Sequence, residues 1–213
     1  MPPNPADGEV ARYHPSVSIF YELESFPEAN LVRLAGDETN RLTRARVIAL
    51  TQVVRRLAEA KDDKPLILTG NEHFFSAGAD LNEIAALTGT AAYEFSAMGQ
   101  SLMNSVANFP APTFAAVRGY CMGGGLDLAL ACRCRIAHSH AIFGHRGAAL
   151  GLITGWGGTQ RLPRLIGKAK ALEMFVAAEK LSAKQALEVG LIDAIAGNPV
   201  VEALRRLTAG SEN

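Results

Sequence analysis

The chain has 213 residues, of which 48% are hydrophobic and 20% charged, a profile typical of a globular protein with a sizeable core. Its 21 Lys and Arg residues balance its 21 Asp and Glu residues, so nucleic acid is not expected as a partner. The start of the chain lacks the basic and apolar regions of a secretory signal, and no apolar run is long enough to cross a bilayer. We therefore expect a cytoplasmic protein that binds neither nucleic acid nor membrane.

The first third of the chain predicts a hairpin, a helix and a buried strand. Residues 1–15 are rich in proline and are expected to be loose. Strands are predicted at Val17–Leu23 and Leu31–Leu34, joined as a hairpin. Apolar residues at helical spacing predict an amphipathic helix from Val47 to Ala60, and the apolar run Pro65–Thr69 predicts a buried parallel strand.

The rest of the chain alternates between helical and strand-like segments. Helices are predicted at 81–87, 91–109, 126–132, 168–178, 182–190 and 200–207, and strands at 113–117, 134–137 and 141–143. A glycine-rich turn at 155–160 leads into a further helix. This alternation predicts an α/β fold whose parallel strands are joined by right-handed crossovers.

Two glycine-bearing segments, Phe75–Leu81 and Gly119–Asp127, each lie between a strand and a helix. Each offers free backbone N–H groups at the start of a helix, where the helix dipole favours negative charge. Two such loops facing each other would form an oxyanion hole for charge developing on a carbonyl oxygen. Asp80, with Glu83 three residues later, is expected to cap the helix that follows the first segment.

Other chemistries find less support in the spacing of reactive residues. Cys132 and Cys134 are too close for a zinc knuckle or a CxxC redox pair. His138 and His140 have no carboxylate at ligand spacing, so no metal is expected. Ser76 has no nearby His–Asp pair in the sequence, and neither glycine loop continues into the Gly-Lys-Ser/Thr of a phosphate-binding P-loop.

Four groups of motifs occur in the order in which a known family has them. They are Leu68–Gly70 with Phe75–Leu81; Ala116–Tyr120 with Gly123–Gly125 and Asp127–Cys132; Phe143–Gly144 with Leu150–Ile153 and Gly157–Pro163; and Leu181–Ala183 with Ala186 and Gly190–Ile192. In these residues the chain resembles the enoyl-CoA hydratase/isomerase family, the crotonase superfamily.

The resemblance implies an architecture and an assembly. It implies a crotonase-like (ClpP/crotonase) fold of repeated ββα units, with a core domain at 16–195 and a short C-terminal helical remnant at 196–213 in place of the further helices usual in the family. It also implies a homotrimer or paired trimers. The substrate would be an acyl-CoA thioester, with coenzyme A as part of the substrate and no separate cofactor.

The resemblance also implies roles for backbone groups. The thioester oxygen would lie between the amides of Ala79 and Gly124, which stabilise an enolate. The adenine side would be held largely by backbone at Ala77, Gly78, Asp80 and Leu81. Because the side chains at 79 and 124 would take no part, we expect replacement by Ala or Ser there to be mild.

The chain departs from the family at both catalytic carboxylates. The first is Asp127, where glutamate is usual, and its carboxylate retreats by about 1.5 Å. The second is replaced by Gly147. The neighbouring His145 and Arg146 are expected as solvated cations on a surface loop; alternatively they replace the missing acid, or Arg146 pins a substrate carboxylate.

We expect Asp127 to act as a general acid/base, although it could instead be a first-turn acid satisfied by backbone and helix dipole. The family default is hydration of a 2-enoyl-CoA. The alternatives are isomerisation by a single base and a non-catalytic acyl-CoA-binding paralogue.

Overall fold

A computed structural model describes residues 16–60 and 63–209, so the prediction for residues 1–15 lies outside the described residues. The larger of two sheets has the strand order β1-β2-β3-β4-β6-β8-β11. Its strands are β1 (Ser16–Val17), β2 (Tyr21–Ser25), β3 (Asn30–Leu34), β4 (Leu66–Thr69), β6 (Thr113–Val117), β8 (Cys134–Ala137) and β11 (Ala194–Ile195). The strands from β3 to β11 are parallel, as predicted.

The predicted N-terminal hairpin is confirmed, with one difference. β2 and β3 pair antiparallel, but the strand expected at Val17–Leu23 is interrupted by a turn, so that β1 folds back onto β2. The amide of Ser18 donates to the carbonyl of Tyr21 at 3.0 Å and closes that turn. The sequence does not reveal this turn, because the residues that form it are of the same types as those in the neighbouring strands.

A smaller sheet has the order β10-β9-β7-β5 and consists of three-residue strands. They are β5 (Phe74–Ser76), β7 (Tyr120–Met122), β9 (Ile142–Gly144) and β10 (Lys180–Ser182). β4, β6 and β8 each enter the large sheet, and the strand after each of them enters the small sheet before a helix follows. This is the expected repeat of ββα units. Of the strands in this small sheet, only β9 was predicted, because three residues carry too little periodicity to identify such strands consistently.

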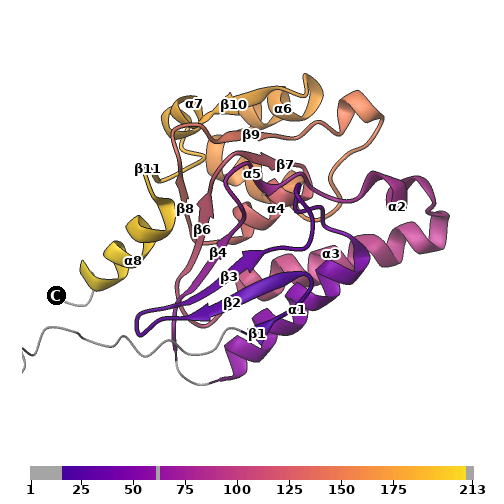
Figure 1. Ribbon diagram of the computed structural model, residues 1–213. Coiled ribbons are helices and arrows are strands. Elements are labelled where there is room, and N and C mark those ends of the chain that lie inside the picture. The colour runs from indigo at the N-terminus through magenta and orange to yellow at the C-terminus, as the bar shows by residue number, and fades with distance from the viewer. Residues whose placement is uncertain (1–15, 61–62, 210–213) are drawn as a thin grey trace, which may run out of the picture.

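Helices lie on both faces of the large sheet (Figure 1), and others pack near the small sheet. They are α1 (Arg44–Glu59), α2 (Leu81–Ala85), α3 (Gly89–Ala107), α4 (Gly124–Ala131), the 3₁₀ turn η1 (Ala148–Leu150), α5 (Gly158–Ile166), α6 (Lys168–Val176), α7 (Ala183–Glu188) and α8 (Pro199–Ala209). α1 and α3 lie side by side on one face, and α8 covers the other face. No helix in the described part of the chain is long and apolar enough to span a membrane.

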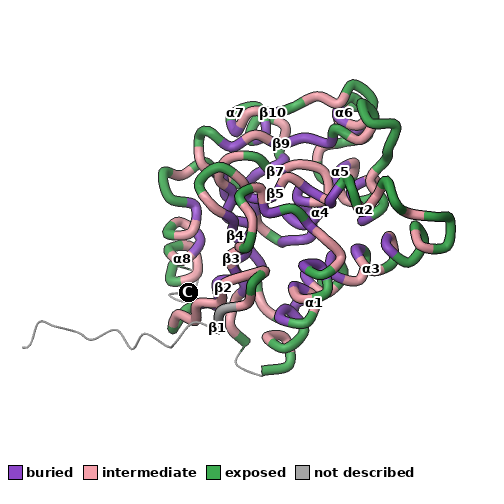
Figure 2. The backbone as a smooth tube through the Cα atoms, turned by 45° about the vertical axis from the view of Figure 1, so that its right-hand side comes forward, coloured by how far each residue is buried: buried purple, intermediate pink, exposed green. Residues whose placement is uncertain are grey.

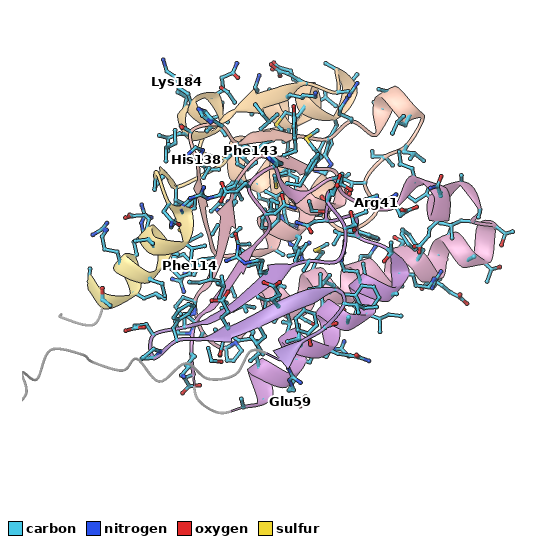
Figure 3. All side chains as sticks on the ribbon, viewed as in Figure 1. Arg41, Glu59, Phe114, His138, Phe143 and Lys184 are labelled. Carbon is cyan, nitrogen blue, oxygen red and sulfur yellow. The ribbon has the colours of Figure 1, made fainter. Side chains whose placement is uncertain are left out.

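Strand alternation divides the core into two clusters. Leu66 and Leu68 of β4 join the large cluster under α1 and α3, whereas Ile67 faces the smaller cluster under α8. Phe114 of β6 belongs to that smaller cluster and lies near α8 (Figure 3). Because both faces of the parallel strands are buried (Figure 2), these strands are mostly apolar.

Candidate functional site

The two glycine loops meet at one edge of the small sheet. β5 and β7 are parallel neighbours, so the residues after each strand emerge side by side. A Cβ added to Gly124 would lie 3.4 Å from the amide nitrogen of Ala79. Gly78 has a φ of +95°, and a Cβ there would lie 2.7 Å from the carbonyl oxygen of Met122. Glycine at position 78 therefore permits the close approach of the loops.

Two backbone amides at this junction stay available for a ligand. Three other amides of the first loop are used within the protein: Ala77 donates to Thr39 O at 2.9 Å, Gly78 to Ser76 Oγ at 3.1 Å, and Asp80 to Leu42 O at 3.4 Å. Among the described residues, the amides of Ala79 and Gly124 have no hydrogen-bond acceptor. They are the two amides predicted to form the oxyanion hole, and the Gly124 amide lies at the N-terminus of α4.

Both residues line a cavity of about 540 Å³. Ala77, Gly78, Ala79, Leu81 and Gly124 line it, but Asp80 does not. The other lining side chains are mostly apolar, among them Phe74, Ile84, Leu87, Phe95, Met122, Leu150, Leu152, Ile153 and Trp156. The basic side chains that line it are His145, Arg146 and Lys180, and no Asp or Glu of the described chain is among the lining residues.

Asp127 lies behind the cavity wall rather than in it. Its side chain is 0% exposed, and it lies in the first turn of α4. The hydroxyl of Thr154 donates to Asp127 Oδ2, and Nε2 of His145 lies 3.2 Å from Asp127 Oδ1. Thr154 and His145 both line the cavity, so they separate the carboxylate from it. The role of Asp127 as an acid/base stays a prediction.

His145 is not the solvated surface residue that we expected. It is only 3% exposed, and its ring packs against that of Phe175 with 5.1 Å between the centroids. Arg146, by contrast, is exposed as expected, and it also lines the cavity. The expectation failed because His145 directly follows the buried end of β9, where the chain turns under α5 and α6.

Trp156 forms one wall of the oxyanion hole. Its indole Nε1 donates to the carbonyl of Phe95 at 3.2 Å, and the two rings lie 5.2 Å apart. A Cβ added to Gly124 would lie 2.5 Å from Cζ3 of Trp156. The expectation that Ala at position 124 would be mild is therefore wrong, because this ring occupies the space that the methyl group needs.

Gly147 lines the cavity at the position of the missing carboxylate. A Cβ there would lie 2.6 Å from the carbonyl oxygen of Leu152. The amides of Leu150 and Leu152 both donate to the carbonyl of Gly147 at 2.8 Å and hold this turn closed. The local backbone thus leaves no space for a side chain at this position.

Asp80 has the capping role that the sequence predicts. Its carboxylate accepts from the amides of Asn82 at 2.9 Å and Glu83 at 3.1 Å, and it pairs with Arg41 at 3.1 Å. Figure 3 shows Arg41 on the α2 side of the molecule. Glu83 does not complete the capping box, because its carboxylate accepts from the amide of Arg44 at 2.7 Å and so ties α2 to α1.

Burial and the charge of Asp127 together shift the pKa values of nearby side chains. Burial lowers the pKa of Arg161, while the charge of Asp127 acts in the opposite direction. Arg161 donates to the carbonyl of Trp156 at 3.3 Å, so it braces the cavity wall rather than lying on a solvated helix face. Burial raises the pKa of Cys121 well above its usual value, and Asp127 adds to the rise.

Thr154 and Trp156 are site residues that the sequence did not identify as such. Thr154 lies in an irregular segment, and nothing in its local sequence links it to Asp127. Ser76, by contrast, is buried and donates to the carbonyl of Asn40 at 2.7 Å, in keeping with a structural role. No cluster of three or more His, Cys, Asp or Glu suited to a metal ion occurs in the described ranges.

Comparison with known proteins places this geometry in a family. Residues 31–209 match the family model described as "Enoyl-CoA hydratase/isomerase". A probable enoyl-CoA hydratase of Bacillus subtilis (strain 168) is 46% identical over 130 residues, which are 61% of this chain and 50% of that protein. The match thus spans half the length of that curated relative.

Solved structures agree with this match. A structure of Pseudomonas aeruginosa DspI is 32% identical, with a TM-score of 0.87 over 92% of this chain and 76% of that one. The enoyl-CoA hydratase of Bacillus anthracis is also 32% identical, with a TM-score of 0.85 over 91% of this chain and 77% of that one. The fold is therefore that of crotonase-type enzymes, and the chain belongs to the enoyl-CoA hydratase/isomerase family.

Proposed function

We propose that this protein binds an acyl-CoA thioester in the cavity and adds water to the double bond of a 2-enoyl-CoA. The observation that carries the proposal is the pair of unused amides of Ala79 and Gly124, two neighbouring residues that line an apolar cavity. As the thioester becomes an enolate, negative charge moves onto its oxygen, and two amides aimed there lower the barrier. One such donor is typically worth about 3 kcal/mol.

The other lining residues suit the two ends of such a substrate. The apolar side chains offer a site for an acyl chain, and the cationic Arg146 and Lys180 suit the phosphates of coenzyme A. Asp127 does not line the cavity, but it contacts the two lining residues Thr154 and His145. Assembly as a homotrimer or paired trimers stays a prediction from the family resemblance, and a cytoplasmic location stays a prediction from the sequence.

The test is to incubate the protein with crotonyl-CoA and follow the loss of the conjugated enoyl absorbance. Asp127→Ala is measured alongside, with Glu188→Ala as a control, because Glu188 is an exposed acid that does not line the cavity. We expect turnover by the parent protein and the control, and a loss of at least about 100-fold in Asp127→Ala. Failure to bind crotonyl-CoA would refute the proposal.

A second candidate function is non-catalytic binding of an acyl-CoA. The observation that favours it is the cavity lining. Among the described residues, no Asp or Glu lines the cavity, and Gly147 occupies the position of the family's second acid. Tight binding of crotonyl-CoA without hydration would support it. Migration of a 3-enoyl double bond without water addition would instead identify an isomerase that uses a single base.

A further inference from the structure

His145 and Asp127 form a buried pair at the back of the cavity. His145 Nε2 and Asp127 Oδ1 lie 3.2 Å apart, within the distance of an ion pair, and neither atom has a hydrogen-bond partner among the described residues. Both residues are more than nine-tenths buried, although the imidazole still lines the cavity. Burying two such polar groups is costly unless they interact with each other or with a ligand.

The pair brings together the two groups that a proton-transferring histidine with an orienting carboxylate requires. An imidazole has two ring nitrogens, and a carboxylate held against one of them sets the tautomer and leaves the other free for a reacting group. Here the Asp127 carboxylate is fully buried, whereas His145 lines the same cavity as Ala79 and Gly124. A proton can therefore reach a ligand from His145 directly, but from Asp127 only through another group.

Two contacts besides His145 fix the position of the Asp127 carboxylate. Thr154 donates to its Oδ2, and its Oδ1 lies beside the backbone of Gly158, where an added Cβ would approach it to 2.1 Å. The same Cβ would lie 3.0 Å from His145 Nε2. The start of α5 therefore presses against both members of the pair and leaves them little freedom to move.

We propose that His145 is the residue that exchanges the proton with the substrate, and that Asp127 is a positioning residue that acts through it. This inference rests on the proposed hydration and names the group that moves the proton in it. It also explains why the chain can have Gly147 in place of the second carboxylate. If one histidine acts first as the base and then as the acid, no second carboxylate is needed to transfer a proton.

The step balances with water as the only co-reactant. Neutral His145 takes a proton from water as the water oxygen bonds to C3 of the enoyl group. The π pair of the C2–C3 bond moves toward the carbonyl and forms an enolate, whose oxygen is held by the Ala79 and Gly124 amides. The enolate then collapses, C2 takes the proton from the imidazolium, and His145 returns to its neutral form.

The test compares His145→Gln, His145→Asn, Asp127→Asn and the double variant Asp127→Asn/His145→Gln. The control is His140→Gln, because His140 is an exposed histidine that does not line the cavity. Three quantities are measured on the full chain: kcat for crotonyl-CoA hydration, the dissociation constant of butyryl-CoA, and exchange of the α-protons of butyryl-CoA with D₂O by NMR. Butyryl-CoA has no double bond to hydrate, so it reports binding and proton transfer separately.

We expect both His145 variants to lose at least about 100-fold in kcat and in exchange, while the butyryl-CoA dissociation constant changes by less than about threefold. Asp127→Asn should lose less, and the double variant should be no slower than His145→Gln, because the two residues act as one unit. His140→Gln should match the parent protein.

Several outcomes would overturn the inference. The first is a His145 variant that keeps the parental kcat. The second is a loss of kcat that is matched by an equal loss of butyryl-CoA affinity. The third is a loss of folding in both His145 variants, which would show that His145 has a structural role. A greater loss in Asp127→Asn than in His145→Gln would show that Asp127 itself transfers the proton. Exchange without hydration in the parent protein would refute the hydration proposal alone, whereas absence of both would refute both proposals.

Discussion

Replacement of Gly124 by alanine tests the oxyanion hole most directly. The added Cβ would lie 2.5 Å from Cζ3 and 2.6 Å from Cε3 of Trp156. Carbon atoms in contact prefer about 3.5–4.0 Å, so the ring and the backbone must separate by about 1 Å. The ring cannot easily yield, because Nε1 bonds to the carbonyl of Phe95 and the indole lies directly over Gly99.

The backbone of the hole is therefore expected to move. A misplacement of about 1 Å can cost about 100-fold in rate, and loss of one oxyanion donor costs about 100- to 1,000-fold in kcat. Overpacking adds a loss of about 1–3 kcal/mol in unfolding free energy. Gly124→Ala should thus lower kcat for crotonyl-CoA by at least about 100-fold and lower Tm by several degrees.

The assay pairs steady-state hydration of crotonyl-CoA with thermal unfolding. The matched control is Gly89→Ala at the start of α3, where an added Cβ meets no atom within 4 Å and helix propensity favours alanine. The control should keep the parental kcat and match or exceed the parental Tm. If Gly124→Ala retained parental kcat and Tm, both the collision with Trp156 and the donor role of the Gly124 amide would be refuted.

Three further predictions follow from burial and charge. Gly147→Glu should lower the unfolding free energy by about 1–3 kcal/mol, because the new Cβ would collide with the carbonyl oxygen of Leu152. It should not raise kcat for crotonyl-CoA hydration, and a variant that is as stable as the parent and has a higher kcat would contradict this. Burial raises the pKa of Asp37, but hydrogen bonds from buried Arg46 and from Thr39 outweigh burial and lower this pKa overall. The ionised Asp37 therefore stabilises the fold above about pH 4, and this stabilisation is lost as the pH falls through the pKa of Asp37 in the folded protein. Arg46→Met should cost about 2–3 kcal/mol at pH 7 and less at pH 3 by denaturant titration; equal losses at both pH values would count against the pairing. Burial raises the pKa of Cys132 to about 12, so its thiol should react with iodoacetamide only upon unfolding, as mass spectrometry of the native and urea-treated protein would show.

The sequence by itself determined the α/β class, the hairpin and most of the helices, because these depend on local periodicity. The helix from Val47 was predicted and is α1, and the apolar runs around Leu66 and Phe114 are buried parallel strands. The two glycine loops were also identified from sequence, since glycine between a strand and a helix marks a place where backbone must approach closely.

Only the tertiary structure decided which groups face the cavity. Asp127 and His145 lie in different ββα units, and their pairing depends on how α4 packs against α5 and against β7, the strand that pairs with β9. The same packing buries Asp127 behind Thr154 and places Trp156 over Gly124. Burial and side-chain direction arise from contacts between segments far apart in the chain, so residue type and local spacing do not encode them.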